Sequence, residues 1–124
     1  MIHLDANFLI GALRRDSPAV VHLENWFRQG ESLATSSIAW AEFLNGPVRP
    51  DQIEHLEYLI QGNIIAFGRR EAEISSRLIN QTGRKRGMQP DCFIAATAIC
   101  ARARLATLNQ RHFAPFASLG LQMA

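Results

Sequence analysis

Asp5, Glu42 and Asp91 are the residues whose types and spacing could support chemistry. Carboxylates that are crowded together raise one another's pKa unless a cation compensates their charge. Mg²⁺ and Mn²⁺ prefer oxygen ligands and keep coordinated waters that a substrate can replace. Such an ion can activate water and polarise a phosphoryl oxygen. The three carboxylates therefore predict a metal-dependent nuclease, provided that the fold brings them together.

The rest of the chain predicts a fold that can do so, because short apolar runs alternate with longer helical patterns. The expected strands cover residues 1–4, 32–35, 63–67 and 105–108, with a fifth at 120–123. The expected helices cover 7–14, 17–30, 36–46, 69–80 and 91–103, with another that Asp51 caps. Right-handed crossovers then give a three-layer α/β/α sandwich with a mostly parallel five-stranded sheet, in which residues 1–124 form a single domain.

Ligands of such sheets bind outside the carboxyl ends of the strands. Asp5 directly follows the first expected strand. Glu42 lies a short way into the helix after the second strand, and helical side chains lean back toward the helix N-terminus. Asp91 opens a helix that must run antiparallel to the strands, and the fourth strand delivers Asn109 to the same place. We therefore expect all four side chains at one edge of the sheet.

Each acidic residue also has an ordinary structural interpretation when it is considered alone. Asp5 is typical of a turn after a strand, Glu42 of a solvated helix face, and Asp91 of a helix N-cap. Their joint placement at one edge favours a functional site over three separate structural roles. No nucleophile motif competes with it, because the chain has no GxSxG and no Cys/His pair at a supporting spacing.

Composition narrows the function less than the motifs do. The chain has 124 residues, 48% of them hydrophobic, and carries 13 basic and 11 acidic residues. Lys85 is the only lysine, and arginine offers a planar fork of donors that suits phosphate. No apolar run approaches the ~20 residues of a membrane helix, and the first residues lack the pattern of a signal peptide. We therefore expect a cytoplasmic protein with no membrane association.

In its ordered motifs the sequence resembles the PIN-domain family, and in particular the VapC-type toxins of bacterial toxin–antitoxin pairs. The resemblance lies in four stretches that occur in family order: IHLDANFLI at 2–10, TSSIAWAEF at 35–43, PDCFIAATA at 90–98, and LATLN at 105–109 with Phe113. Each motif is weak alone, whereas the ordered set is fairly specific and spans nearly the whole chain.

The resemblance implies Mg²⁺- or Mn²⁺-dependent cleavage of RNA, a homodimer, and inhibition by a small antitoxin protein. It places metal ligation on Asp5 and Asp91 most firmly and then on Glu42, and it gives Asn7 a supporting polar role near the metal. Many relatives carry a fourth acid at or just after the position of Asn109. Its absence here favours one firmly held ion over two, since an amide binds a hard cation less strongly than a carboxylate does.

Two further interpretations of the same fold remain open, namely a non-catalytic RNA-binding PIN module and a housekeeping RNA-processing nuclease. A signalling receiver domain also gathers acids at strand ends. It would need a phosphorylatable Asp at the end of the third strand, where this chain has Ala66-Phe67-Gly68. We therefore rank the receiver below the nuclease.

Basic and aromatic residues complete the set of candidates. Arg84-Lys85-Arg86 precede Asp91 in a polar loop and are candidates for contacts with the RNA backbone, with a solvated charge run as the alternative interpretation. His112 could contact phosphate, although a loop histidine is the preferred interpretation, and His3 inside the first strand is expected to be a core histidine.

For Trp26 and Trp40, packing in the core or at a dimer interface is preferred over stacking on RNA bases. Arg14-Arg15 and Arg69-Arg70 are interpreted as ordinary surface, and His22 and His55 as exposed helix residues.

Overall fold

Five parallel strands form the centre of the molecule in a computed structural model that describes residues 1–124. Their order across the sheet is β3-β2-β1-β4-β5. The strands are β1 (Ile2–Leu4), β2 (Leu33–Ser36), β3 (Ile64–Ile65), β4 (Arg104–Ala106) and β5 (Gln122–Met123). This confirms the predicted α/β fold and makes the sheet parallel throughout.

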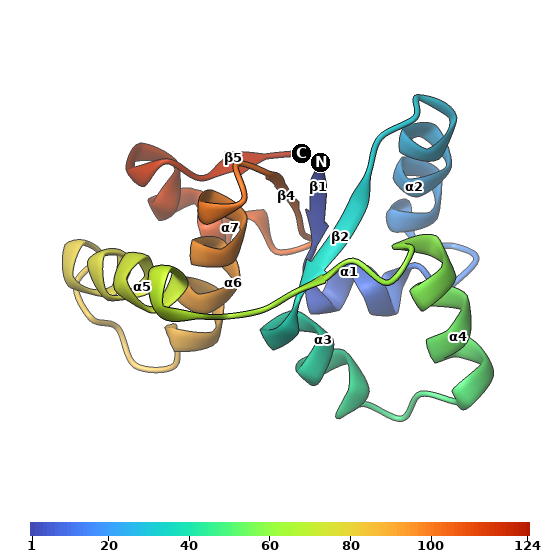
Figure 1. Cartoon of the computed structure of the whole chain (residues 1–124), viewed down its shortest axis with the longest axis horizontal. Helices are drawn as coiled ribbons and strands as arrows, with labels where there is room; N and C mark the ends of the chain where they lie inside the picture. The colour runs from blue at the N-terminus through green and yellow to red at the C-terminus, as the bar shows by residue number, and fades with distance from the viewer.

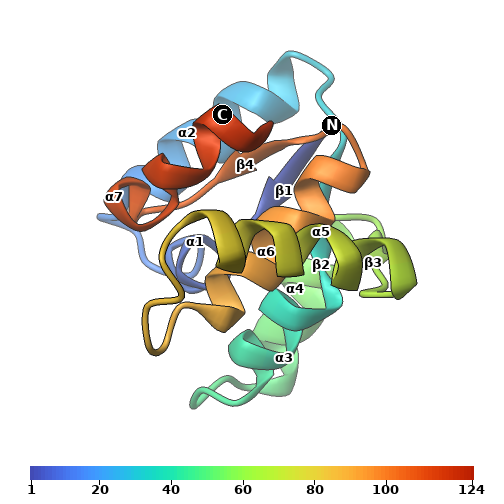
Figure 2. The same cartoon turned by 90° about the vertical axis from the view of Figure 1, so that its left-hand side faces the viewer.

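Helices cover both faces of this sheet, as Figure 1 shows. On one face lie α1 (Ala6–Gly11), α2 (Pro18–Arg28) and α4 (Pro50–Leu59), and on the other lie α5 (Arg69–Gln81), α6 (Gln89–Cys100), α7 (Gln110–Phe113) and the 3₁₀ helix η1 (Ala114–Leu119). The helix α3 (Ser37–Leu44) lies beyond the carboxyl ends of the strands. Figure 2 looks onto the α5 side, where α5 crosses in front of α6.

Each face of the sheet has its own hydrophobic core. Phe8, Leu23 and Leu56 belong to the core under α1, α2 and α4, whereas Ile94 and Phe113 belong to the core under α5, α6 and α7. The alternation of side chains along a strand supplies both cores, since successive residues point to opposite faces. The helix α6 is apolar on nearly every side because it is enclosed by the sheet and α5.

Serine caps position two of the helices that carry or flank the acidic residues. The hydroxyl of Ser36 accepts a hydrogen bond of 3.0 Å from the amide of Ala39, and that of Ser17 accepts one of 3.2 Å from the amide of Ala19. Such bonds satisfy amides that would otherwise be unpaired at a helix start. They therefore fix where α2 and α3 begin.

The order of the strands creates a switch point beside β1. The chain runs from β1 outward through β2 to β3, and then crosses back to place β4 on the other side of β1. Leu4 pairs with Ala106, and the amide of Asp5 donates to the carbonyl of Ala106 over 2.9 Å. The residues that follow these two strands, Asp5 and Thr107, are therefore neighbours at the edge where such folds bind ligands.

Several predicted boundaries are wrong. The helix α6 begins at Gln89, so Asp91 lies in its first turn and does not cap it. The reason is Pro90, which suits the first turn of a helix because its missing N–H is not needed there. Similarly, α4 begins at Pro50 with Arg49 as its N-cap, so Asp51 is not the cap.

Four of the five strands are also shorter than predicted, with β3 confined to two residues, whereas β2 has the predicted length and is shifted by one position. The short helices α7 and η1 were not predicted. None of the helices is long and apolar enough to cross a membrane.

Candidate active site at the carboxyl edge of the sheet

Asp5 is the most deeply placed of the predicted acidic residues, with 5% of its surface exposed. It caps α1, since Oδ1 accepts a hydrogen bond of 2.8 Å from the amide of Ala6. Oδ2 accepts a bond of 2.7 Å from the hydroxyl of Thr107. Burial raises the pKa of Asp5, the two hydrogen bonds oppose that rise, and the charge of Asp91 adds to it. The carboxylate is thus rigidly held in a site that disfavours its charge.

Thr107 and Asn7 connect α1 to the segment after β4. The Thr107 hydroxyl accepts a hydrogen bond of 3.1 Å from the amide of Asn109 while it donates to Asp5. Oδ1 of Asn7 accepts a bond of 3.0 Å from the amide of Leu108. Asn7 therefore orders the backbone beside Asp5. Thr107 was not among the predicted site residues, and its contacts with Asp5 and Asn109 emerge only from the structure.

Glu42 lies on α3, and its side chain belongs to the same electrostatic environment as the other two acids. Partial desolvation of its carboxylate is the main cause that raises its pKa, and the charges of Asp5 and Asp91 raise it further. The residue as a whole is exposed. The structure therefore brings Glu42 to the predicted edge, on its solvent side.

Asp91 lies in the first turn of α6, and 30% of its side chain is exposed. Burial raises its pKa, whereas the nearby imidazole of His112 lowers it. Nδ1 of His112 lies 3.6 Å from Oδ2 of Asp91, an ion pair when the imidazole is protonated. His112 thus lies beside an acidic residue of the site, in α7 and not in the expected loop.

These three carboxylates have the chemistry of a site for a hard divalent cation. They come from three elements, and each has a raised pKa, so that their charges are poorly compensated by the protein itself. All of them offer oxygen donors, which Mg²⁺ and Mn²⁺ prefer. No three His, Cys, Asp or Glu side chains already lie at metal-ligand spacing in the structure. The residues fit such an ion by type and charge, and binding would draw the carboxylates closer together.

Two cavities flank the acidic residues. One, of about 490 Å³, is lined by Thr107, Asn109 and His112 together with aromatic residues of α1 and α2. The other, of about 760 Å³, is lined by Asn7, Asn109, Arg14 and Arg15. The sequence analysis interpreted Arg14-Arg15 as ordinary surface, because nothing in a dipeptide of arginines shows that its turn will border a site.

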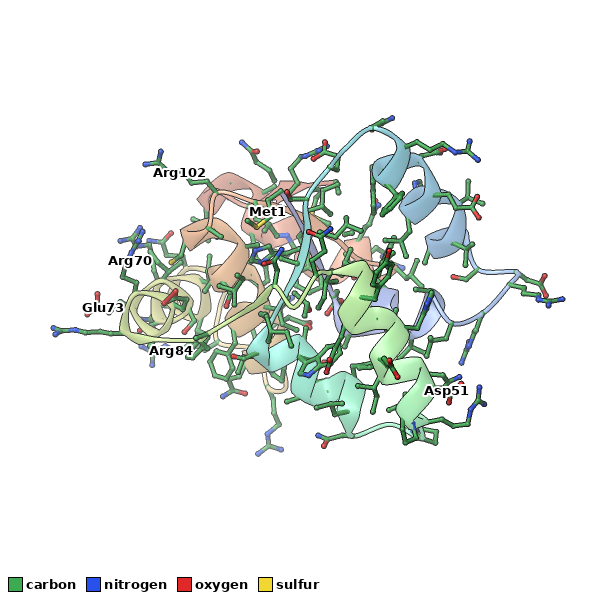
Figure 3. All side chains as sticks on the ribbon, turned by 45° about the vertical axis from the view of Figure 1, so that its right-hand side comes forward. Met1, Asp51, Arg70, Glu73, Arg84 and Arg102 are labelled. Carbon is green, nitrogen blue, oxygen red and sulfur yellow. The ribbon has the colours of Figure 1, made fainter.

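The basic loop 84–86 joins α5 to α6 and is exposed throughout. Nε of Arg84 donates a hydrogen bond of 2.8 Å to Oδ1 of Asn80, which orders the beginning of the loop. Figure 3 shows Arg84 beside α5, on the side of the molecule opposite Asp51 of α4. The loop leads directly into the helix that carries Asp91, although its residues line neither of the two cavities.

Comparison with known proteins identifies relatives over almost the whole chain. A family model described as PIN domain matches residues 2–118. Ribonuclease VapC19 of Mycobacterium tuberculosis is 33% identical over 119 residues, which cover 94% of each protein.

Solved structures agree with this result. A toxin–antitoxin complex from Klebsiella pneumoniae is 30% identical and superposes with a TM-score of 0.73, over 92% of this chain and 91% of the other. FitAcB from Neisseria gonorrhoeae superposes with a TM-score of 0.74 over 100% of this chain and 97% of the other. Its identity of 24% supports a common fold alone.

Proposed function

This chain belongs to the PIN domain family, and from that premise we propose that it is a metal-dependent endoribonuclease, the toxin of a toxin–antitoxin pair. The observation that carries the proposal is the convergence of Asp5, Glu42 and Asp91 at the switch point of the sheet, where each has a raised pKa. Groups with perturbed pKa values gather at functional sites, because function often requires charges that folding alone would not favour.

Asp5, Asp91 and Glu42 would hold one Mg²⁺ or Mn²⁺, with Asp5 and Asp91 as the primary ligands. When bound, the ion supplies a Lewis acid for a phosphoryl oxygen and lowers the pKa of a coordinated water. Each oxygen of Asp5 accepts one hydrogen bond, which leaves lone pairs free on a carboxylate that cannot rotate. Asn109 stands where many relatives have a fourth acid, which is why we propose a single ion.

Other side chains of the site would bind and orient the substrate. His112 lies beside Asp91 and is exposed, so a protonated imidazole can contact both the carboxylate and an RNA phosphate. Asn7 acts indirectly, since its bond to the amide of Leu108 holds the segment that positions Thr107. The loop 84–86 supplies positive charge for the RNA backbone, which contributes most of the sequence-independent affinity for nucleic acids.

The proposed partners follow from the relatives. Ribonuclease VapC19 is named for cleavage of RNA, and the Klebsiella pneumoniae structure is a complex of toxin with antitoxin. We accordingly propose RNA as the substrate, a small cognate antitoxin as the inhibitor, a homodimer as the assembly and the cytoplasm as the compartment. Native mass spectrometry of the purified chain, alone and with the product of a neighbouring small gene, tests the assembly and the inhibitor.

Cleavage of RNA by the purified protein tests the proposed activity. We expect labelled RNA to be cut in the presence of Mg²⁺ or Mn²⁺, cutting to stop in excess EDTA, and activity to return when the metal is restored. Binding that weakens with salt, without cleavage under any of these conditions, would instead support a non-catalytic RNA-binding module. Full activity in EDTA would exclude the metal-dependent mechanism.

A further inference from the structure

A cavity of about 490 Å³ opens between α2 and the segment that follows β4, directly beside the acidic residues. We propose that this cavity, here called the aromatic cleft, binds one unpaired nucleobase of the RNA next to the phosphate that is cleaved. The inference rests on the proposed function, since it assigns a base-binding subsite to that nuclease. Its volume falls within the range of about 300–1,000 Å³ that is usual for small-molecule sites.

One wall of the aromatic cleft is a cluster of rings from α1 and α2. Trp26 stacks on Phe8 with ring centroids 5.6 Å apart and an interplanar angle of 26°. His22 stacks on Trp26 with centroids 5.5 Å apart and an angle of 23°. Phe8 is buried, Trp26 is half-buried and His22 is exposed. The rings of Phe8 and His22 are tilted by 42°. The cluster is thus anchored in the core by Phe8, and Trp26 and His22 offer nearly parallel rings on which a flat base can stack.

Trp26 therefore does more than pack in the core. It does contact the core under α1 and α2, as the sequence analysis preferred. It also lines the aromatic cleft, as do Phe8 and His22.

The opposite wall is polar and basic. It is formed by Thr107, Asn109, Gln110 and Arg111, with His112 at the end nearest Asp91. The side chain of Asn109 makes no capping bond at the start of α7, so its amide is available to a ligand. Amide groups can pair with the hydrogen-bonding edge of a base, and an arginine can bind the phosphate beside it. A peptide ligand would leave this combination of a flat aromatic wall and a cationic rim largely unused.

Position links the aromatic cleft to the reaction. Thr107 lines the cleft and donates its hydroxyl to Asp5, and His112 lines the cleft and contacts Asp91. A base held in the cleft therefore places its own phosphate within the reach of the acidic residues. Bases are accessible in this way only when they are unpaired, so the cleft favours single-stranded segments and loops.

Fluorescence of Trp26 tests this inference without any cleavage. The chain has two tryptophans, so the variant Trp40→Phe leaves Trp26 as the only one. This variant would be titrated in EDTA with single-stranded RNA oligonucleotides of each base, and with a base-free ribose-phosphate oligomer of the same length and charge. We expect at least one base to quench Trp26 and the base-free oligomer to leave it unchanged. The complementary variant Trp26→Phe should show no base-dependent change in Trp40.

The variant His22→Ala measures how much the exposed ring contributes. We expect it to weaken binding of the quenching RNA by roughly fivefold to a hundredfold, as loss of one stacked aromatic does, and to leave binding of the base-free oligomer unchanged. His55→Ala is the matched control, because His55 is another exposed helical histidine and does not line the cleft. A tyrosine at position 22, in the variant His22→Tyr, should restore affinity.

The inference and the proposed nuclease can fail separately. Two results would show that the aromatic cleft does not bind a base: quenching of Trp26 by the base-free oligomer as strongly as by RNA, or wild-type affinity of His22→Ala for every oligomer. Either result would stand even when metal-dependent cleavage is intact. Base-dependent quenching in a protein that never cleaves RNA would support base binding in the aromatic cleft and contradict the proposed nuclease activity.

Discussion

The hydroxyl of Thr107 donates a hydrogen bond of 2.7 Å to Oδ2 of Asp5, across 102 positions of sequence. The bond joins the ends of β1 and β4, the two strands that flank the switch point. It lowers the pKa of Asp5 against the effect of burial, and so favours the ionised form that a metal ligand needs. It also fixes the orientation of that carboxylate.

Thr107→Val should therefore impair the site while preserving its shape. The replacement keeps the volume of a buried residue and removes the hydroxyl, so that Oδ2 of Asp5 and the amide of Asn109 each lose a partner. A hydrogen bond to a charged group contributes about 1.5–3 kcal/mol, so we expect Mg²⁺ affinity to fall by roughly tenfold or more. Isothermal titration calorimetry measures this directly. Thr107→Ser retains the hydroxyl and should bind Mg²⁺ nearly as the wild type does; equal affinities for Val and Ser would contradict the positioning role.

Asp91→Asn should abolish cleavage and yet leave the protein at least as stable in EDTA. The substitution removes a carboxylate whose pKa is raised by burial. The negative charge of this carboxylate also raises the pKa of Asp5 and Glu42. The metal should then no longer raise the melting temperature, because metal that binds only the folded state stabilises it by mass action. Asp5→Asn should behave alike in cleavage, and Glu42→Gln should give a smaller loss.

Asp51→Asn is the matched control for these variants, since Asp51 is exposed, pairs with Arg49 and is not among the groups that shift the pKa of Asp5, Glu42 or Asp91. It should keep both its cleavage rate and its metal-dependent rise in melting temperature. Persistent cleavage by Asp91→Asn, or a metal response equal to that of Asp51→Asn, would remove Asp91 from the proposed ligands.

The positions of the acids could be predicted from the sequence, but the contacts between them could not. Asp5 ends an apolar run, and the direction in which Glu42 leans follows from helix geometry alone. The bond from Thr107 to Asp5 depends on β4 lying beside β1 in a particular register, which long-range packing decides. The helices α7 and η1 were missed because they are too short to show a period, and with them the approach of His112 to Asp91.

Neutralising the loop 84–86 should weaken RNA binding and make it less sensitive to salt. For single-stranded nucleic acids each phosphate contact contributes about 0.7 to the slope of log affinity against log salt concentration. The triple variant of Arg84→Gln, Lys85→Gln and Arg86→Gln should lower that slope by up to about 2 if every side chain contacts the backbone. Fluorescence anisotropy in EDTA gives the slope.

Two other pairs of arginines give the comparison. Arg14 and Arg15 line a cavity beside Asn7 and Asn109, so their replacement by glutamine should also reduce the slope. Arg69 and Arg70 lie at the far end of α5 from the loop and should have little effect. If the Arg69 and Arg70 variant lowers the slope as much as the loop variant does, binding depends on net charge alone and the loop has no special role.

His3 should make the fold lose stability in mild acid. The residue is 1% exposed, and neither ring nitrogen has a hydrogen-bond partner. Burial, followed by the charge of the N-terminus, lowers the pKa of His3 from 6.5 to about 4. The folded state therefore keeps a neutral ring while the unfolded chain binds a proton, so the free energy of unfolding should fall between pH 6.5 and about 4. The loss from this residue reaches at most about 3 kcal/mol.

His3→Leu should remove this part of the pH dependence and raise stability at neutral pH. Leucine fills a similar space and leaves no buried polar atom without a partner, a defect that costs about 1–3 kcal/mol. Urea unfolding in EDTA at several pH values measures both effects, with His55→Gln as the exposed control. Because His55 is solvated, its variant should lose stability in acid as the wild type does. A parallel loss in His3→Leu would show that other groups cause the acid sensitivity and that the His3 ring is protonated without cost to the fold.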